Sequence, residues 1–568
     1  MKQPSFQSRI RIVAVCVFLV AVVFLVRLFS LQVINNNFYA EKADRQYITP
    51  SGNVFNRGDI FFSKKDGSLV SAASVTTGFK IAINPKEIKE GKEIYEKLSP
   101  YLKMDEETFL SKASRKDDPY EEIATGLTKE QVTEIDSLKI KGLSTFKQNW
   151  RNYPSGNLAA HSIGFLAYKG DDLVGQYGLE RYYNDVLSKP KNEAYVNFFA
   201  EVFSNIKETF SDTAKGDIVT TMEPIVEHEL QKELVSIMET WTADEAAGII
   251  INPTNGEIYA MSGLPDFDLN NFKEVKNIGV YRNPFVENVF EFGSVIKPLV
   301  IAAGLDAGVI TPKTQYYDAG SVVVDKKIIN NFDKKGRGTV TIQDVLNQSL
   351  NTGMVFAEQK LGHEKFRNYM KSYGIGEKTG IDLPNETSGL IRNLESPRNI
   401  EYANASFGQG IALTPIEAVR AFSILANGGN MITPHLVKEI KYENGLSKKI
   451  EYPYVKTNIL SKEATDTITE MLIKVYESYD SGRHKMPSYT VATKTGTAQV
   501  AKETGGGYYD DRNMHSFFGY FPARDPKFLI FLYVKNPKGV KYASQTLIPP
   551  FNNLTKFLIN YYNLPPDR

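Results

Sequence analysis

The chain has 568 residues, of which 42% are hydrophobic and 23% are charged, and its formal net charge is +1. This length predicts two or three domains. The balanced charge gives no bulk electrostatic reason to expect nucleic acid as a partner. Cys16 is the only cysteine, which excludes both a disulfide within the chain and a zinc site built from thiolates.

The first 33 residues have the composition of a membrane anchor. Lys2, Arg9 and Arg11 precede the uncharged residues 12–26, and an apolar pattern continues to residue 33. Residues 12–33 are therefore predicted to cross the cytoplasmic (inner) membrane once. The basic flank predicts that residues 1–11 are cytoplasmic and that the remainder is extracytoplasmic, in the periplasm. A cleaved signal peptide is an alternative, but it would need small residues directly after the apolar run, and none follows it there. A buried core helix is another alternative, but it would not need the basic flank.

Residues 34–215 predict a mixed α and β region without a chemical centre. Short strand-like runs near residues 70–83 precede charged segments with helical spacing at 87–101, 106–112 and 129–138. The histidines from His161 onwards are scattered, and no metal site is predicted from them.

From residue 216 the pattern favours a layered domain. Turn residues 252–256 separate two apolar runs and predict a hairpin. The remaining expected elements are strands at 217–222, 489–500, 515–520 and 528–534, and helices at 225–241, 342–361, 462–475 and 551–562. The simplest arrangement is one sheet, built from the hairpin and the late strands, with helices on both faces.

One serine heads an apolar helical pattern and is followed three residues later by a lysine. Ser294 and Lys297 share a helix face at this spacing, so a hydroxyl nucleophile can lie beside an amine base. Ser349 and Asn351 can supply a proton relay and an amide. A strand-like segment then offers a cation, two hydroxyls and a glycine that permits close backbone approach, in Lys494, Thr495, Gly496 and Thr497.

Each of these short motifs also occurs elsewhere in the chain. Ser-x-x-Lys recurs at Ser188 and Ser204, Ser-x-Asn at Ser51 and Ser155, and Lys-Thr-Gly at Lys378. Context separates the copies, because only Ser294 precedes an apolar helix and only Lys494 lies in a segment of β composition. Taken singly, each motif also fits a helix cap, a surface turn or a strand end. The ordered set, Ser294 to Asn351 to Lys494, favours a catalytic site.

With these motifs in this order, the chain resembles the class B penicillin-binding proteins, the monofunctional peptidoglycan D,D-transpeptidases. Further family-like segments are Arg57-Gly58-Asp59-Ile60, Arg151-Asn152-Tyr153-Pro154, Tyr177-Gly178-Leu179-Glu180, Ser406-Phe407-Gly408-Gln409-Gly410 and His515-Ser516-Phe517-Phe518-Gly519-Tyr520. The resemblance implies an α/β (α+β) penicillin-binding transpeptidase or serine β-lactamase-like fold, with a central antiparallel sheet flanked by helices. It also implies a pedestal domain at 34–215 and a transpeptidase domain at 216–568. Two departures are Phe292, where the family usually has proline, and residues 61–67, which replace the usual Asp-Arg-Asn-Gly.

The resemblance also implies roles for the candidate residues. Ser294 would attack the carbonyl between the last two D-alanines of a stem peptide, and Lys297 would accept its proton. The amides of Ser294 and Thr497 would form the oxyanion hole. Ser349 would relay a proton, Asn351 would hold the peptide amide, and the terminal carboxylate would lie against Lys494, Thr495, Gly496 and Thr497. The chemistry implied needs no metal and no cofactor.

The implied substrates are lipid-linked peptidoglycan stem peptides, and the implied inhibitors are β-lactams. A membrane-spanning glycosyltransferase is the expected partner, and a modest pedestal favours division over elongation. Two alternatives remain: a D,D-carboxypeptidase or serine β-lactamase, in which water resolves the acyl-enzyme, and a non-catalytic scaffold or β-lactam sensor. A hydrolase needs neither anchor nor pedestal, and a sensor needs a longer cytoplasmic output segment than residues 1–11.

Overall fold

The computed structural model describes residues 55–170, 172–189, 215–502 and 507–568. The predicted anchor at residues 12–33 and the tail before it lie outside the described residues. Over the described ranges, no helix is both long and apolar enough to cross a membrane. Its described residues divide into two compact units, one containing residues 76–150 and the other containing residues 57–75, 151–170, 172–189, 215–502 and 507–568.

The smaller unit is a mixed α and β structure with its own apolar core. Its core side chains include Ile81, Leu98, Phe109 and Ile135. Strands β3 and β4 both pair with β2. Its elements are the later part of β2 (Leu69–Ile83), α3 (Gly91–Leu98), η2 (Ser99–Tyr101), α4 (Glu106–Ala113), β3 (Glu121–Leu127), α5 (Lys129–Ser137) and β4 (Leu143–Asn152).

The larger unit begins with strands that join distant parts of the sequence. β1 (Ile60–Ser63) pairs antiparallel with the start of β2 and parallel with β7 (Gly216–Thr220). β7 in turn pairs with β14 (Val437–Tyr442), whose other neighbour is β15 (Ser447–Lys449). Short elements follow β4: α6 (Ala160–Ile163), β5 (Leu166–Lys169), β6 (Asp172–Gly175), α7 (Gly178–Tyr182) and α8 (Asn184–Leu187).

Three of the family-like segments meet at a buried ion cluster in this unit. The two carboxylate oxygens of Glu180 each accept a hydrogen bond of 2.6 Å, one from Arg57 Nε and one from Arg151 Nε. Tyr153 adds its hydroxyl at 3.3 Å. All three charged side chains are at most 3% exposed, so removing one partner would leave an uncompensated buried charge.

A five-stranded antiparallel sheet forms the centre of the larger unit, in the order β16-β17-β18-β8-β9. Its strands are β8 (Glu245–Ile251), β9 (Ile258–Leu264), β16 (Ala492–Ala501), β17 (Tyr508–Phe521) and β18 (Phe528–Lys535). The hairpin and the late strands therefore share one sheet, as the sequence predicts. Strand β18 joins them, with Leu529 opposite Ile251.

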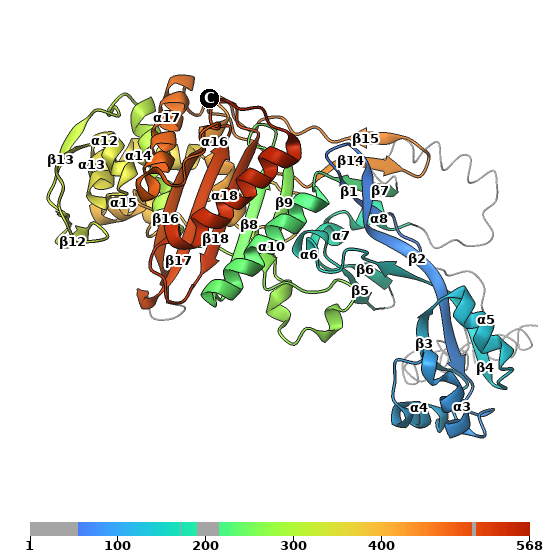
Figure 1. The fold of residues 1–568 in the computed structure, drawn as a ribbon. Coiled ribbons are helices and arrows are strands. Elements are labelled where there is room, and N and C mark those ends of the chain that lie inside the picture. Colours follow the sequence, from blue (N-terminus) through green and yellow to red (C-terminus); the bar gives the residue numbers. More distant parts are fainter. Residues whose placement is uncertain (1–54, 171, 190–214, 503–506) are drawn as a thin grey trace, which may run out of the picture. The chain divides into compact units, whose positions relative to one another are not determined.

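Helices cover both faces of this sheet. Side chains alternate along a strand: in β18, Ile530 and Leu532 pack in the apolar cluster with α10 and α18, whereas Leu529 and Phe531 pack in the cluster with α11, α16 and α17. Figure 1 shows α10 and α18 side by side across the near face. These helices are α10 (Pro224–Trp241), α11 (Lys297–Asp306), α16 (Pro415–Ala426), α17 (Lys462–Ser478) and α18 (Ala543–Tyr562).

A helical region with two small antiparallel sheets adjoins α11. One sheet pairs β10 (Gln315–Asp318) with β13 (Gly338–Thr341), and the other is the hairpin of β11 (Ser321–Val324) and β12 (Lys327–Asn330). Its helices are α12 (Ile342–Asn347), α13 (Asn351–Leu361), α14 (His363–Ser372) and α15 (Asn399–Ala405). Short 3-10 turns are η3 (Phe272–Glu274), η4 (Ile278–Tyr281), η5 (Gly293–Ile296), η6 (Arg392–Glu395) and η7 (Tyr479–Gly482).

Two predicted helices differ from those observed. The helix expected at 342–361 is broken into α12 and α13 at Ser349, whose φ is +53°. The final helix begins at Ala543 rather than near residue 551, although Pro549 and Pro550 lie inside it. Full burial of Leu547 and Ile548 against the sheet outweighs the low helix propensity of proline.

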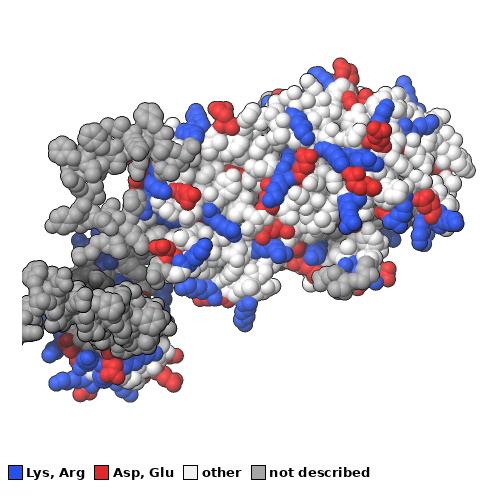
Figure 2. Space-filling model, turned by 180° about the vertical axis from the view of Figure 1, so that it is seen from behind, with Lys and Arg blue, Asp and Glu red and all other residues white. Residues whose placement is uncertain are grey.

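On the one face drawn in Figure 2, the described charged side chains form no field of one sign. On the face seen in Figure 2, Lys and Arg are interspersed with Asp and Glu, as the net charge of +1 suggests.

Candidate active site

Ser294 lies in the 3-10 turn η5, one turn ahead of the buried helix α11. Gly293 begins the turn with φ +65°, which favours glycine. A Cβ at Gly293 would come within 2.9 Å of the Thr497 carbonyl oxygen, so glycine here also allows the turn to lie against β16. Ser294 is half-buried, and its carbonyl accepts a hydrogen bond from the Lys297 backbone N–H.

The Lys297 side chain is fully buried, at 0% exposure. Its Nζ donates to the Ser349 carbonyl at 2.7 Å, to Asn351 Oδ1 at 2.8 Å and to Ser349 Oγ at 3.2 Å. Within the described residues, Ser294 Oγ is not among these partners. The structure therefore brings Lys297 together with Ser349 and Asn351. The expected side-chain contact between Ser294 and Lys297 is not among the hydrogen bonds of the described residues.

Ser349 connects the two halves of the site. Its left-handed backbone, with φ +53°, separates α12 from α13 and directs both its carbonyl and its hydroxyl to Lys297. Its hydroxyl also receives a hydrogen bond of 3.2 Å from Lys494 Nζ. A non-glycine residue in this region costs about 1–3 kcal/mol and typically persists where function requires it.

Lys494 extends from the edge strand β16 and is 1% exposed. Besides Ser349, its Nζ contacts the Thr495 carbonyl at 2.9 Å. Thr495 is half-buried, and its backbone N–H donates to the Tyr479 hydroxyl at 3.2 Å. Thr497 is exposed, and its Oγ1 accepts from the Ala543 amide.

Gly496 permits the close approach of β16 to the serine turn. A Cβ at this position would lie 2.3 Å from Ser516 Oγ and 2.5 Å from the Phe292 carbonyl oxygen. Because those two atoms are themselves hydrogen-bonded at 2.7 Å, neither has room to move. The second Lys-Thr-Gly, at residues 378–380, has different contacts. The backbone N–H and the hydroxyl of Thr379 donate to the Glu386 carboxylate, and the Lys378 carbonyl accepts from Arg420.

Phe292, the departure from the usual proline, is a core residue. It is 0% exposed, and its ring packs against Phe290, Phe531 and Tyr533 at centroid distances of 5.0–5.9 Å. The aromatic ring therefore anchors the serine turn on the sheet, a contact for which the sequence alone gave no signal.

Burial shifts both lysines toward their neutral forms. Desolvation, and secondarily the charge of Lys494, holds the pKa of Lys297 well below its ordinary value of 10.5. Desolvation lowers the pKa of Lys494 to about 7. A neutral Lys297 can accept a proton, as a general base requires.

The site predicts a bell-shaped pH dependence of β-lactam acylation. The rate constant rises as Lys297 loses its proton, and it falls as Lys494 loses the charge that would hold a carboxylate. The fall is expected near pH 7, because the Lys494 pKa is lowered to about 7. Second-order acylation rates between pH 5 and 10 measure this profile. A falling limb near pH 10, or the same limb in Lys494→Arg, would contradict it.

Sequence reasoning missed a second group of polar residues behind Asn351, namely Asp318, Asn330, Asn331 and Thr352. The Asn351 Nδ2 donates to the Asn330 carbonyl at 3.0 Å. Their only sequence signal is an Asn-Asn pair after a short strand, which is too common to stand out. In the part of the chain that the structure describes, no cluster of three or more His, Cys, Asp or Glu residues could hold a metal ion.

Two protein-family models match this chain. Residues 246–556 match the penicillin binding protein transpeptidase domain. The chain belongs to this family. Residues 55–221 match the penicillin-binding protein dimerisation domain. The transpeptidase family, the enzyme class and the fold predicted from the sequence are thereby confirmed.

Individual relatives of this transpeptidase agree. It is 30% identical to stage V sporulation protein D of Bacillus subtilis, over 88% of this chain and 77% of that protein. It is 26% identical to a probable peptidoglycan D,D-transpeptidase PenA of Neisseria meningitidis, over 100% of this chain and 95% of the relative. The crystal structure of penicillin-binding protein 2X from Streptococcus thermophilus has the same fold, with a TM-score of 0.72 and 22% identity over 90% of this chain and 81% of that one.

Proposed function

We propose that this transpeptidase cross-links peptidoglycan stem peptides through an acyl-enzyme on Ser294, with release of D-alanine. The observation that carries the proposal is the buried pair of lysines on either side of the Ser349 hydroxyl, 3.2 Å from each Nζ. A serine nucleophile needs a nearby general base, and a lysine can serve as one only when its amine is neutral, which the lowered pKa of Lys297 favours.

The proposed acylation begins with attack of Ser294 Oγ on the carbonyl carbon of the penultimate D-alanine. Lys297 takes the hydroxyl proton. The amides of Ser294 and Thr497 hold the oxyanion, and loss of one such donor typically costs about 3 kcal/mol. When the C–N bond breaks, Ser349 passes a proton from the lysine pair to the leaving amine of D-alanine. An amine of a second stem peptide then attacks the ester, and its proton returns through the same group.

Substrate recognition is assigned to Asn351 and to β16. The Asn351 amide would hold the peptide bond of the donor. The terminal carboxylate would lie against Lys494, Thr495, Gly496 and Thr497. Thr497 is the exposed member of this set, while Lys494 brings a positive charge when protonated. β-Lactams would enter the same position as carboxylate-bearing mimics.

The proposed location is the cytoplasmic membrane, with residues 12–33 as a single span and the catalytic domain in the periplasm. The family match at residues 55–221 supports a pedestal within residues 34–215, ahead of a transpeptidase domain at 216–568. A membrane-spanning glycosyltransferase at the division septum is the proposed partner. Complementing a depleted strain with Ser294→Ala tests the role, because loss of a division enzyme gives filaments and loss of an elongation enzyme gives round cells.

A product assay separates cross-linking from hydrolysis. The full-length enzyme is incubated with lipid-linked donor peptides and a labelled amine acceptor, and the products are separated by mass. The expected result is an amide between donor and acceptor, with one D-alanine released for each bond. Free tetrapeptide without amide product, with the glycosyltransferase partner present, would assign the enzyme to the D,D-carboxypeptidases instead.

A further inference from the structure

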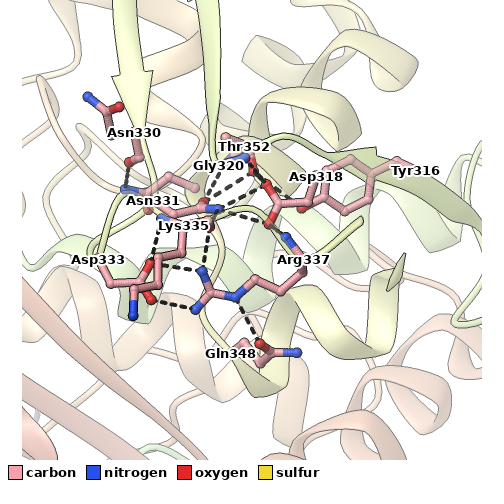
Figure 3. A network of polar contacts seen from close by, with 11 residues as sticks. Tyr316, Asp318, Gly320, Asn330, Asn331, Asp333, Lys335, Arg337, Gln348 and Thr352 are labelled. Atoms are coloured by element: carbon pink, nitrogen blue, oxygen red, sulfur yellow. Dashed lines mark hydrogen bonds and ion pairs between the residues drawn. The ribbon is translucent and has the colours of Figure 1, made fainter. Parts of the chain in front are cut away.

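A buried polar network lies behind Asn351, where the small β10–β13 and β11–β12 sheets meet the start of α13. Figure 3 shows Asp318, Asn331 and Thr352 converging at its centre, with Arg337 on its outer side between Asp333 and Gln348. Asp318 and Asn331 are each 1% exposed, and Thr352 is 6% exposed. None of the three has a role in the proposed chemical steps.

Asp318 acts as the acceptor at the centre of this network. Its carboxylate accepts from the Gly320 amide at 2.9 Å, from the Arg337 amide at 3.1 Å and from Thr352 Oγ1 at 2.8 Å. Asn331 Nδ2 lies 3.0 Å from both carboxylate oxygens. The Asp318 carboxylate therefore has four donors. Because a buried carboxylate is stable only when its lone pairs accept hydrogen bonds, this arrangement also fixes the position of Asn331, which is one of the donors.

Asn331 caps the helix that carries Asn351. Its Oδ1 accepts from the Thr352 backbone N–H at 3.2 Å and lies 3.1 Å from Thr352 Oγ1, whose single proton is donated to Asp318. The residue in the N-cap position of α13, Leu350, makes no side-chain cap. Helix starts leave amide groups without partners, so here the cap comes from a neighbouring hairpin rather than from the helix itself.

The residue before Asn331 orients the Asn351 amide. Asn351 Nδ2 donates to the Asn330 carbonyl at 3.0 Å, and its Oδ1 therefore faces Lys297 Nζ at 2.8 Å. An asparagine amide has two possible orientations, and only this one places an acceptor against the amine. The contacts run without a gap from Asp318 through the Asn330-Asn331 pair to Asn351 and Lys297.

We propose that Asp318 is a positioning residue for the transpeptidase reaction, which holds the Asn330-Asn331 turn so that Asn351 presents its oxygen to Lys297. The inference rests on the proposed roles of Lys297 and Asn351. It adds a requirement that the catalytic motifs alone do not contain: a buried carboxylate on β10, outside the three motifs, sets the geometry of the general base.

Asp318→Asn tests the proposal with almost no change in shape. The new amide group would face the donors Asn331 Nδ2 and Arg337 N–H, so the Asn330-Asn331 turn must shift. The second-order rate constant for acylation by a fluorescent penicillin is expected to fall about 100-fold, the typical effect of a displacement near 1 Å. The acid limb of its pH profile should move to lower pH, because Asn351 no longer stabilises the Lys297 ammonium.

Asp333→Asn is the matched control in the same turn. Asp333 pairs with the Arg337 guanidinium at 2.8 and 2.9 Å but does not contact Asp318, Asn331 or Asn351 in the described structure. Its acylation rate should stay within about twofold of the parent, because the Asp333–Arg337 pair lies on the outer side of the network and its loss leaves the four donors to Asp318 in place. A second pair keeps the test open if Asp318→Asn fails to fold: Thr352→Val, which removes the hydroxyl donor, should acylate more slowly than Thr352→Ser, which retains it.

A purely structural role for Asp318 gives a different result. The melting temperature would fall, while the folded protein would keep its rate constant and its pH limb, and that outcome would overturn the inference. Equal rates in the two Thr352 variants would overturn it as well. Failure of the proposed function is distinguishable, because it would appear as labelling of Ser294→Ala, whatever residue stands at position 318.

Discussion

Ser294→Ala is expected to abolish covalent labelling by a fluorescent penicillin. The adduct requires a bond to Ser294 Oγ, and Lys297, although buried beside it, would then have no hydroxyl to deprotonate. The variant should remain folded, because the half-buried serine side chain contributes little to packing and its carbonyl contact with the Lys297 amide is retained. Gel fluorescence after incubation with the probe, together with a melting curve, measures both effects.

Ser188→Ala provides the control for this loss of labelling. Ser188 begins another Ser-x-x-Lys sequence, but its hydroxyl contacts Arg57 and Asn184, away from both site lysines. It should label like the parent protein. Equal labelling of Ser294→Ala and the parent would remove Ser294 from its proposed role.

Lys297→Met is expected to slow acylation by about 100-fold to 10,000-fold, which is the usual contribution of a positioned general base. Methionine has a similar length and fits an apolar helix, but it can neither accept the serine proton nor donate to Ser349 and Asn351. Stopped-flow or quenched acylation by a β-lactam measures the rate constant. A rate close to that of the parent would show that another group is the base.

The same variant should change the pH dependence of stability. The folded state binds the Lys297 proton more weakly than the unfolded chain does, since burial holds the pKa well below 10.5. Between these two pKa values the unfolded chain carries more protons, so native stability rises with pH. Methionine does not titrate, so the Lys297→Met variant lacks this rise of stability with pH. The melting temperature of Lys297→Met relative to the parent should therefore be more favourable at pH 7 than at pH 10.

Local sequence patterns predicted the central sheet because the apolar residues that form each strand are the ones that the sheet buries. Residues 528–534 form a continuous apolar run, which is typical of a strand buried on both faces, and helices cover both faces in the structure. The sequence did not predict the break at Ser349, because its pattern favours one helix over 342–361. In the structure, the contact of the Ser349 carbonyl with Lys297 favours a left-handed conformation at this residue. Tertiary contacts decide such positions, and local propensity does not contain them.

The candidate site was predictable for a different reason. Ser294, Lys297, Ser349, Asn351 and Lys494 lie far apart in sequence but occur as recognisable short motifs, and hydrogen bonds link the last four in the structure. Asp318 has no motif. Its importance comes from four donors brought to it by three separate segments, an arrangement visible only after folding. The same holds for Phe292, whose ring contacts come from a strand more than two hundred residues later.

The pairing of β8 with β18 also determines when this enzyme can become active during its synthesis. The β8–β9 hairpin emerges early, yet the edge of β8 stays unpaired until β18, near the end of the chain, has arrived. Contacts between such distant segments form slowly, and an apolar strand with an open edge is prone to aggregation meanwhile. The serine turn rests on β16, which belongs to the same late group. A growing chain therefore carries Ser294 long before the strand that supports its turn has been made.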